Sequence, residues 1–236
     1  MEAGALSVDR NIIVQFLAEE LKTSVIQDYC PNGLQVEGSV HVRSIVSGVT
    51  ASQALIDMAV ELKADTLLVH HGYFWRGENA VITGLKRNRI KQLLVHDINL
   101  LTYHLPLDLH PEIGNNAQLG RVLGFTPTGR FGEHGLGWLG TLADPEIATA
   151  GQLAEHVEKV LGRKPLLVGD PFLPVGTVGW CSGAAQDMIA DAVNAGAGIY
   201  LSGEISEQTV HEARENGIAY LACGHQATER YGIQAL

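Results

Sequence analysis

The sequence predicts an α/β protein made of two related lobes of layered strand–helix units, with a metal site between them. Three observations support this fold class. Strand and helix patterns alternate almost throughout the chain, which favours mostly parallel strand pairing. One helix–strand stretch recurs later in the chain without gaps. Histidine and acidic residues repeatedly stand where a predicted strand ends.

The first lobe is predicted to begin with a helix over residues 11–22, with Asp9 near its start as a candidate cap. A turn at Pro31, Asn32 and Gly33 then leads into a short strand. The remaining elements are a strand over 43–49, a helix over 51–63, a buried strand over 65–69, a helix over 85–95 and a strand over 98–102.

The second lobe is predicted to continue the alternation. Its strands cover 137–144, 166–170, 177–181, 198–202 and 218–223, and its helices cover 151–162, 184–196 and 206–216. We place the boundary near residues 124–130, which gives a first lobe of 1–127 and a second of 128–223. The last segment, 224–236, resembles the end of the first lobe, so we expect it to return there.

The recurring stretch is residues 51–71, which match residues 184–204 with seven identities at an offset of 133 positions. Two alanine-rich helix–strand units could also match by chance, because their apolar faces align anyway. A second similarity follows, since a carboxylate comes four residues after a histidine in both His104/Asp108 and His225/Glu229. We therefore predict that the two units superpose and lie in different sheets.

Composition excludes several classes of protein. A net charge of −10 argues against nucleic-acid binding, which needs a basic face. No apolar run approaches the ~18 residues of a membrane span, and the first residues do not read as a signal peptide. Three cysteines, far apart and odd in number, favour a reducing, cytoplasmic location over a disulfide framework.

Five residues are predicted metal ligands. In open α/β sheets, ligands collect beyond the carboxyl ends of strands, where His70, His71 and His225 all fall. Just past a strand end both imidazoles of the His70–His71 pair can turn into one crevice; the alternative is a structural pair bonded to the backbone. Asp108 and Glu229 add hard anionic oxygens, and Glu229 could bridge two cations or simply cap a helix. Mixed imidazole and carboxylate donors suit zinc, iron, manganese or nickel.

The local structure around these residues is also predictable. Pro106 and Pro111 should keep the segment around Asp108 extended rather than helical. A helix beginning near Ala227, capped by Thr228 or Gln226, would place Glu229 near a positive helix end.

Two further residues are predicted to line the metal crevice without being ligands. His104 and Glu204 fall at strand ends, and both residue types serve as general acids or bases. The alternative is that both form only hydrogen bonds between the lobes. Cys223 is predicted to be a small buried strand residue and not a ligand. The chain has no P-loop and no nucleophile elbow.

The segments DYCPNGLQVEG, VHHGYFWRGE, INLLTYHLPLDLHPEIGNNAQL and GHQATERYG closely resemble the Nif-three-like dinuclear metal-centre family, whose bacterial members are often labelled type 2 GTP cyclohydrolase I. The resemblance implies two cations per subunit. It places His71 and Asp108 on one, His70 and His225 on the other, and Glu229 as a bridge. It also implies a hexameric ring. Family chains continue past the last motif with a longer helix and a strand, whereas only seven residues follow Glu229 here.

This resemblance implies a metal-dependent hydrolase that acts on a small nucleotide-like or phosphorylated substrate, possibly GTP, through metal-activated water. The alternative is a non-enzymatic metal-binding protein that regulates or acts as a scaffold through a ring assembly. An enzyme should keep an open coordination position, whereas a structural site would be closed.

Overall fold

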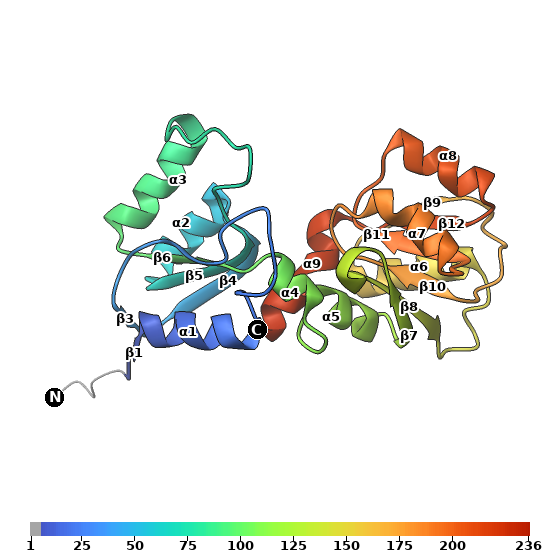
Figure 1. Cartoon of the computed structure of the whole chain (residues 1–236), viewed down its shortest axis with the longest axis horizontal. Coiled ribbons are helices and arrows are strands. Elements are labelled where there is room, and N and C mark those ends of the chain that lie inside the picture. The colour runs from blue at the N-terminus through green and yellow to red at the C-terminus, as the bar shows by residue number, and fades with distance from the viewer. Residues whose placement is uncertain (1–5) are drawn as a thin grey trace. The chain divides into compact units, whose positions relative to one another are not determined.

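A computed structural model describes residues 6–236 of the chain, which form two compact units (Figure 1). The first unit ends at Leu107 and the second runs from Asp108 to Leu236. Every described helix is too short or too polar to cross a membrane.

Unit 1 contains a four-stranded sheet in the order β2-β6-β5-β4. β4, β5 and β6 are parallel, and β2 pairs antiparallel with β6 at one edge. In Figure 1, α1 lies on one side of this sheet and α2 and α3 lie on the other. The elements are β1 (Val8–Asp9), α1 (Arg10–Glu20), β2 (Gly33–Val36), β3 (His41–Val42), β4 (Ile45–Thr50), α2 (Gln53–Glu61), β5 (Thr66–His71), α3 (Gly84–Val95) and β6 (Asn99–Thr102).

The core of unit 1 forms because its two inner strands are apolar on the face that α2 and α3 cover. Leu67, Val69 and Leu100 pack with Ile56 of α2 and Leu93 of α3, and all five are buried. Asp9 caps α1 as predicted, since its carboxylate accepts the backbone N–H of the second residue after it. This packing fixes β5 at the centre of the sheet, where its last residues can reach a site.

Unit 2 contains a six-stranded sheet in the order β7-β8-β10-β11-β12-β9, in which β10, β11 and β12 are parallel. Its elements, after α4 (Leu105–Leu109), are α5 (Asn115–Val122), β7 (Phe125–Phe131), η1 (Glu133–Gly135), β8 (Gly137–Leu142), α6 (Ala150–Leu161), β9 (Leu166–Val168), β10 (Val178–Trp180), η2 (Gln186–Met188), α7 (Ile189–Asn194), β11 (Ile199–Ser202), α8 (Glu207–Glu215), β12 (Ala219–Ala222) and α9 (His225–Ala235).

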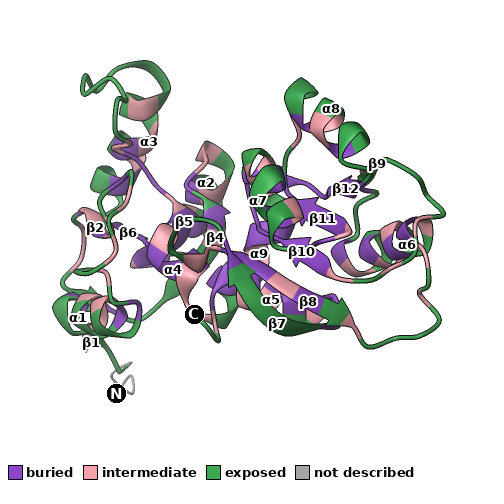
Figure 2. Cartoon of the chain, turned by 45° about the vertical axis from the view of Figure 1, so that its right-hand side comes forward, coloured by how far each residue is buried: buried purple, intermediate pink, exposed green. Residues whose placement is uncertain are grey.

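The parallel strands β10, β11 and β12 of unit 2 are buried, and their alternating side chains enter cores on both faces of the sheet. Leu201 and Leu221 belong to a core with α5 and α6, whereas Tyr200 and Tyr220 belong to a core with α7 and α8. Figure 2 shows these strands as buried between helices whose outer faces are exposed. A sheet covered on both faces by helices is the α/β architecture that the sequence predicts.

The two units share a topology. Read from its antiparallel edge, unit 1 has the order β2-β6-β5-β4, and four strands of unit 2 have the order β9-β12-β11-β10 with the same strand directions. The pairs Ile45–Thr66 and Val178–Ile199 lie in equivalent register at the predicted offset of 133. The repeated strands lie in different sheets, as predicted. The next strand shifts the alignment, because Asn99 corresponds to Ala219. His104 is therefore aligned one position before His225.

The division of the chain differs from the predicted lobes of 1–127 and 128–223. The turn-forming residues near 124–130 suggest a linker, but they form β7, an edge strand paired with β8. Pro127 is tolerated there because an edge strand can lack a backbone donor on its outer side. The last segment, 224–236, was expected to return to the first lobe. It packs on α5, which lies within the predicted first lobe but belongs to unit 2.

Two local predictions near the site are wrong. The segment around Asp108 is helical, because Pro106 sits in the first turn of α4, where a missing backbone N–H costs no helical bond. The last helix, α9, begins at His225 and not near Ala227. Thr228 therefore lies in its first turn and donates its hydroxyl hydrogen back to carbonyls of that turn instead of capping it.

Candidate metal centre

Two adjacent histidines form the end of β5, with the strand running through both of them. His70 is fully buried, and its Nδ1 lies 2.9 Å from the backbone oxygen of Tyr103. His71 is partly exposed, and its Nδ1 lies 3.2 Å from Oγ1 of Thr50. The two rings lie 4.5 Å apart, centroid to centroid, so the predicted gathering of both imidazoles is present within unit 1.

The residue after the pair, Gly72, lies where there is little room for a side chain. A Cβ at Gly72 would collide with the side chains of Gln35 and Thr102. That space holds the Gln35 side chain, whose oxygen accepts the backbone N–H of Tyr73 at 2.7 Å. The turn that follows the histidines is thereby tied to β2.

His104 joins the histidine pair from the end of β6. Its ring centroid lies 5.0 Å from that of His70 and 5.7 Å from that of His71. Its Nδ1 lies 2.7 Å from the carboxylate of Asp28. Trp75 packs edge-on against the His104 ring at 4.9 Å. Unit 1 therefore holds three imidazoles together beside the Trp75 side chain.

Asp28 is the main support of His104, a role that was not predicted from the sequence. Burial alone would raise its pKa, but hydrogen bonds from His104, Asn32 and the Tyr29 backbone, with the charge of His104, outweigh burial and lower it. Its second oxygen accepts the N–H of Leu105 at 2.9 Å. The acidic residue before the Pro31–Gly33 turn was the available signal, but only the fold places it against His104.

In unit 2, His225 lies between two carboxylates. Its Nδ1 is 2.6 Å from Oε1 of Glu204, and its Nε2 is 3.1 Å from Oε2 of Glu229. The hydrogen bond and charge of Glu229, with a smaller contribution from Glu204, raise the pKa of His225 to about 9. The two carboxylates therefore favour the protonated imidazole. A cation between His225 and Glu229 would replace that proton.

Asp108 is held by a different contact of unit 2. Asn115 at the start of α5 donates from Nδ2 to Oδ1 of Asp108 at 2.8 Å. The Asn115 oxygen accepts the backbone N–H of Gly232 in α9 at 3.1 Å. One fully buried amide thus connects α5, α9 and a candidate ligand.

Gly183, which no sequence motif indicated, shapes the surroundings of Glu229. It follows β10 with a φ of +68°, and an added Cβ would collide with Oε1 of Glu229. Its backbone N–H donates to Oγ1 of Thr228 at 3.0 Å. Thr228 and Gly183 together define where the Glu229 carboxylate can lie.

The predicted site residues thus fall into two local groups, with Asp108 held by its own contact in unit 2. His70, His71 and His104 are together in unit 1, and Glu204, His225 and Glu229 are together in unit 2. Imidazole nitrogens and carboxylate oxygens are donors that zinc, iron, manganese and nickel accept. Histidines whose Nδ1 is held by a carboxylate or a carbonyl are typical of metal ligands. Both groups therefore fit a divalent metal. Cys223 is buried, as predicted, and burial raises the pKa of its thiol.

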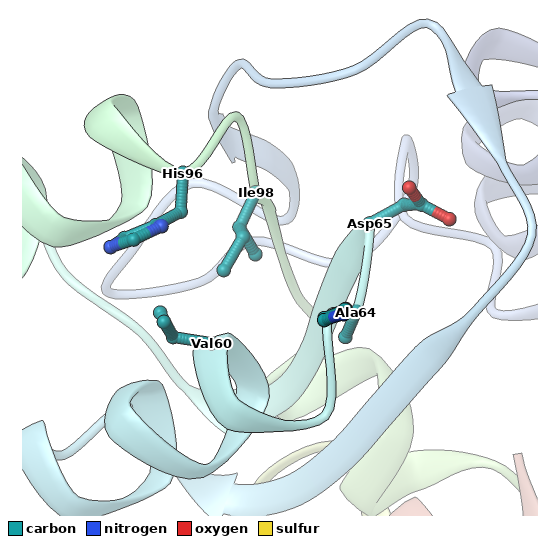
Figure 3. A pocket seen from close by; sticks show the side chains of 6 residues that line it. Val60, Ala64, Asp65, His96 and Ile98 are labelled. Carbon is teal, nitrogen blue, oxygen red and sulfur yellow. The ribbon is translucent and has the colours of Figure 1, made fainter.

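A cavity of about 190 Å³ in unit 1 lies away from these histidines (Figure 3). Val60, Ala64, Asp65 and Ile98 line it near the starts of β5 and β6, whereas the histidines lie at or just after the other ends of these strands. It contains His96 but no group of metal-binding side chains among the described residues. The chemistry of unit 1 is therefore concentrated at the opposite edge of the sheet.

Comparison with known proteins agrees with this description. The chain is 55% identical over 234 residues to a Pseudomonas aeruginosa (strain PAO1) protein named GTP cyclohydrolase 1 type 2 homolog, which covers 98% of this chain and 92% of the relative. An Escherichia coli (strain K12) protein of the same name is 53% identical over 223 residues, 94% of this chain and 89% of the relative.

Solved structures give the same answer for the fold. A structure described as protein ybgI, of unknown function, matches with a TM-score of 0.92 and 51% identity, over 97% of this chain and 91% of that one. The protein TTHA1606 from Thermus thermophilus matches with a TM-score of 0.82 and 32% identity, over the same shares of the two chains. The profile of one family matches residues 8–236. The chain belongs to the Duf34/NIF3 (NGG1p interacting factor 3) family.

Proposed function

We propose that this protein is a dinuclear metal-dependent hydrolase that acts on a small nucleotide-like or phosphorylated molecule, with GTP as the first candidate. The observation that carries the proposal is the arrangement of the imidazoles, which have Nδ1 held by protein oxygens at 2.6–3.2 Å. The carboxylates of Glu229 and Asp108 supply anionic donors. The names of the bacterial relatives support a cyclohydrolase-like reaction.

In this proposal His70, His71, Asp108, His225 and Glu229 hold two cations, with Glu229 as the bridge. When bound, such cations act as Lewis acids and lower the pKa of a bound water toward neutrality. Glu204 positions His225, because a carboxylate at Nδ1 requires a proton there and leaves the lone pair on Nε2. Asn115 positions Asp108 in the same sense.

Metal stoichiometry tests the first half of the proposal. Purified protein loaded with zinc or manganese should contain close to two cations per chain by elemental analysis. Glu229→Ala should lower this number, because one carboxylate serves both ions. A wild-type stoichiometry of one that Glu229→Ala leaves unchanged would contradict the bridge.

Turnover tests the second half. The metal-loaded protein should release formate from GTP, or hydrolyse another member of a panel of nucleotides and phosphorylated metabolites. His71→Ala should abolish this turnover. His41→Ala should not, because His41 is an exposed histidine remote in the chain from the site. Two bound metals with no turnover on any compound would favour the second candidate, a metal-binding regulatory or scaffold protein. The relatives are named only as homologs of a cyclohydrolase, which is compatible with this second candidate.

Two further expectations belong to this proposal. We propose a ring of six subunits, which the molar mass from light scattering would test. We also propose a cytoplasmic location, because the three cysteines are buried and unpaired by disulfides. Fractionation of cells would test it.

A further inference from the structure

We infer that His104 is itself a metal ligand, so that unit 1 presents three histidines, His70, His71 and His104, to the metal centre. The inference rests on the proposed function in that it concerns the same centre. It departs from the prediction that His104 lines the site without binding metal. All of the geometry that supports it lies within unit 1.

The first support is distance. Each of the three histidines offers one ring nitrogen such that these atoms lie within 4.8 Å of one another. Zinc binds imidazole nitrogens at about 2.0–2.1 Å in a tetrahedral arrangement, so bound nitrogens lie roughly 3–3.5 Å apart. The three nitrogens are therefore close enough for His104 to reach an ion that His70 or His71 holds.

The second support is the tautomer of each ring. The backbone oxygen of Tyr103 can only accept, so Nδ1 of His70 must carry the hydrogen. The carboxylate of Asp28 imposes the same tautomer on His104. In both rings the lone pair is then on Nε2, the nitrogen that can bind a cation. The hydroxyl of Thr50 permits this tautomer at His71.

The third support is the rigidity of the anchor. Oδ1 of Asp28 faces His104, and Oδ2 accepts N–H groups from Leu105 at 2.9 Å and from Asn32 at 2.8 Å. The Asn32 oxygen accepts the backbone N–H of His104 at 2.8 Å. Both the side chain and the backbone of His104 are thus fixed by one loop.

These hydrogen bonds also decide whether Asp28 is a metal ligand or an anchor for His104. Cys30 lies close enough to Asp28 and His104 for the three to form a separate metal site. Both Asp28 oxygens, however, already accept hydrogen bonds from neighbouring N–H groups. Burial and the charge of Asp28 also raise the pKa of the Cys30 thiol to about 12, which disfavours the thiolate that a metal needs. Asp28 is therefore an anchor for His104 and not a ligand.

The decisive experiment reads the bound nitrogens directly in the wild-type protein. Chain labelled with ¹⁵N-histidine is loaded with ¹¹³Cd, and imidazole signals are assigned by single histidine substitutions. We expect one-bond ¹¹³Cd–¹⁵N coupling at Nε2 of His70, His71 and His104. Coupling at His70 and His71 but not at His104 would overturn the inference and leave the proposed function intact. No coupling at any histidine would remove both.

A binding experiment gives a second readout that does not depend on activity. His104→Ala should weaken zinc binding, measured by competition with a chelating dye, by at least about tenfold. His41→Ala is the matched control, because His41 is an exposed histidine of the same unit outside the group. Equal zinc affinity in His104→Ala and His41→Ala, with both variants folded by circular dichroism, would refute the role of His104.

Discussion

Replacing Gly183 by alanine tests whether the Glu229 carboxylate needs the space beside this glycine to bind metal. The backbone strain of the substitution can be measured separately. At a φ of +68° an alanine costs about 1–2 kcal/mol relative to glycine. The new methyl group would also lie within 3.0 Å of Oε1 of Glu229. That oxygen is the end of a flexible side chain, so the carboxylate can swing away at little cost to stability. The metal centre, however, would lose the position of its proposed bridge.

Gly196→Ala is the matched control, because Gly196 has a φ of +89° and no atom within 4 Å of an added Cβ. Both variants should lose about 1–2 kcal/mol of unfolding free energy in urea, measured without metal. Only Gly183→Ala should bind zinc more weakly, by about 10–100-fold, which corresponds to about 1.4–2.7 kcal/mol. Equal zinc affinity in the two variants would refute the reasoning.

Three other perturbations have defined outcomes. Glu204→Gln should lower zinc affinity about 10–100-fold, since it weakens the contact that orients His225; unchanged affinity in a chelator competition would contradict this role. Burial would raise the pKa of Asp65, but hydrogen bonds from Arg43 and the next backbone N–H outweigh it and lower the pKa below 3.8. Asp65 therefore stabilises the fold above pH 3.8. Asp65→Asn should cost about 1 kcal/mol in urea unfolding at pH 7, and this loss should shrink as pH falls through the folded-state pKa. Trp180→Ala, at a fully buried position, should cost about 3–5 kcal/mol in the same assay, and a loss below 1 kcal/mol would contradict its place in the core.

The sequence was sufficient for the fold class because the parallel strands are buried on both faces. Such strands appear as short apolar runs, and the polar residues that follow them stand out. The ends of β5 and β6 could therefore be located before the structure, together with His70, His71 and His104. The shared topology also followed, because the helix–strand repeat retained its spacing through β4 and β5.

The supports of the site residues could not be predicted, because they come from residues distant in the chain. Asp28 reaches His104 across 76 positions, and Gly232 reaches Asn115 across 117. The position of Asp28 before the Pro31–Gly33 turn is the only local signal, and it indicates a turn residue, not a partner of His104. The helical state of the segment around Asp108 was missed for a related reason: a proline in a first helical turn looks like a helix breaker until the start of the helix is known.

The repeat itself predicts topology better than it predicts chemistry. Gly203 is the counterpart of His70, and a side chain there would lie 2.5 Å from the oxygen of Gly183 and 2.8 Å from the Cα of His225. The backbone at the end of β11 is closed tightly, with the N–H of Gly203 donating to Gly183 and that of Gly224 donating to Gly203. A histidine cannot occupy this position in unit 2. That unit instead offers its imidazole from the first residue of α9, one position beyond the counterpart of His104. Equivalent strands thus provide different donors, and local packing, not the duplicated pattern, determines which residue of each unit can serve as a ligand.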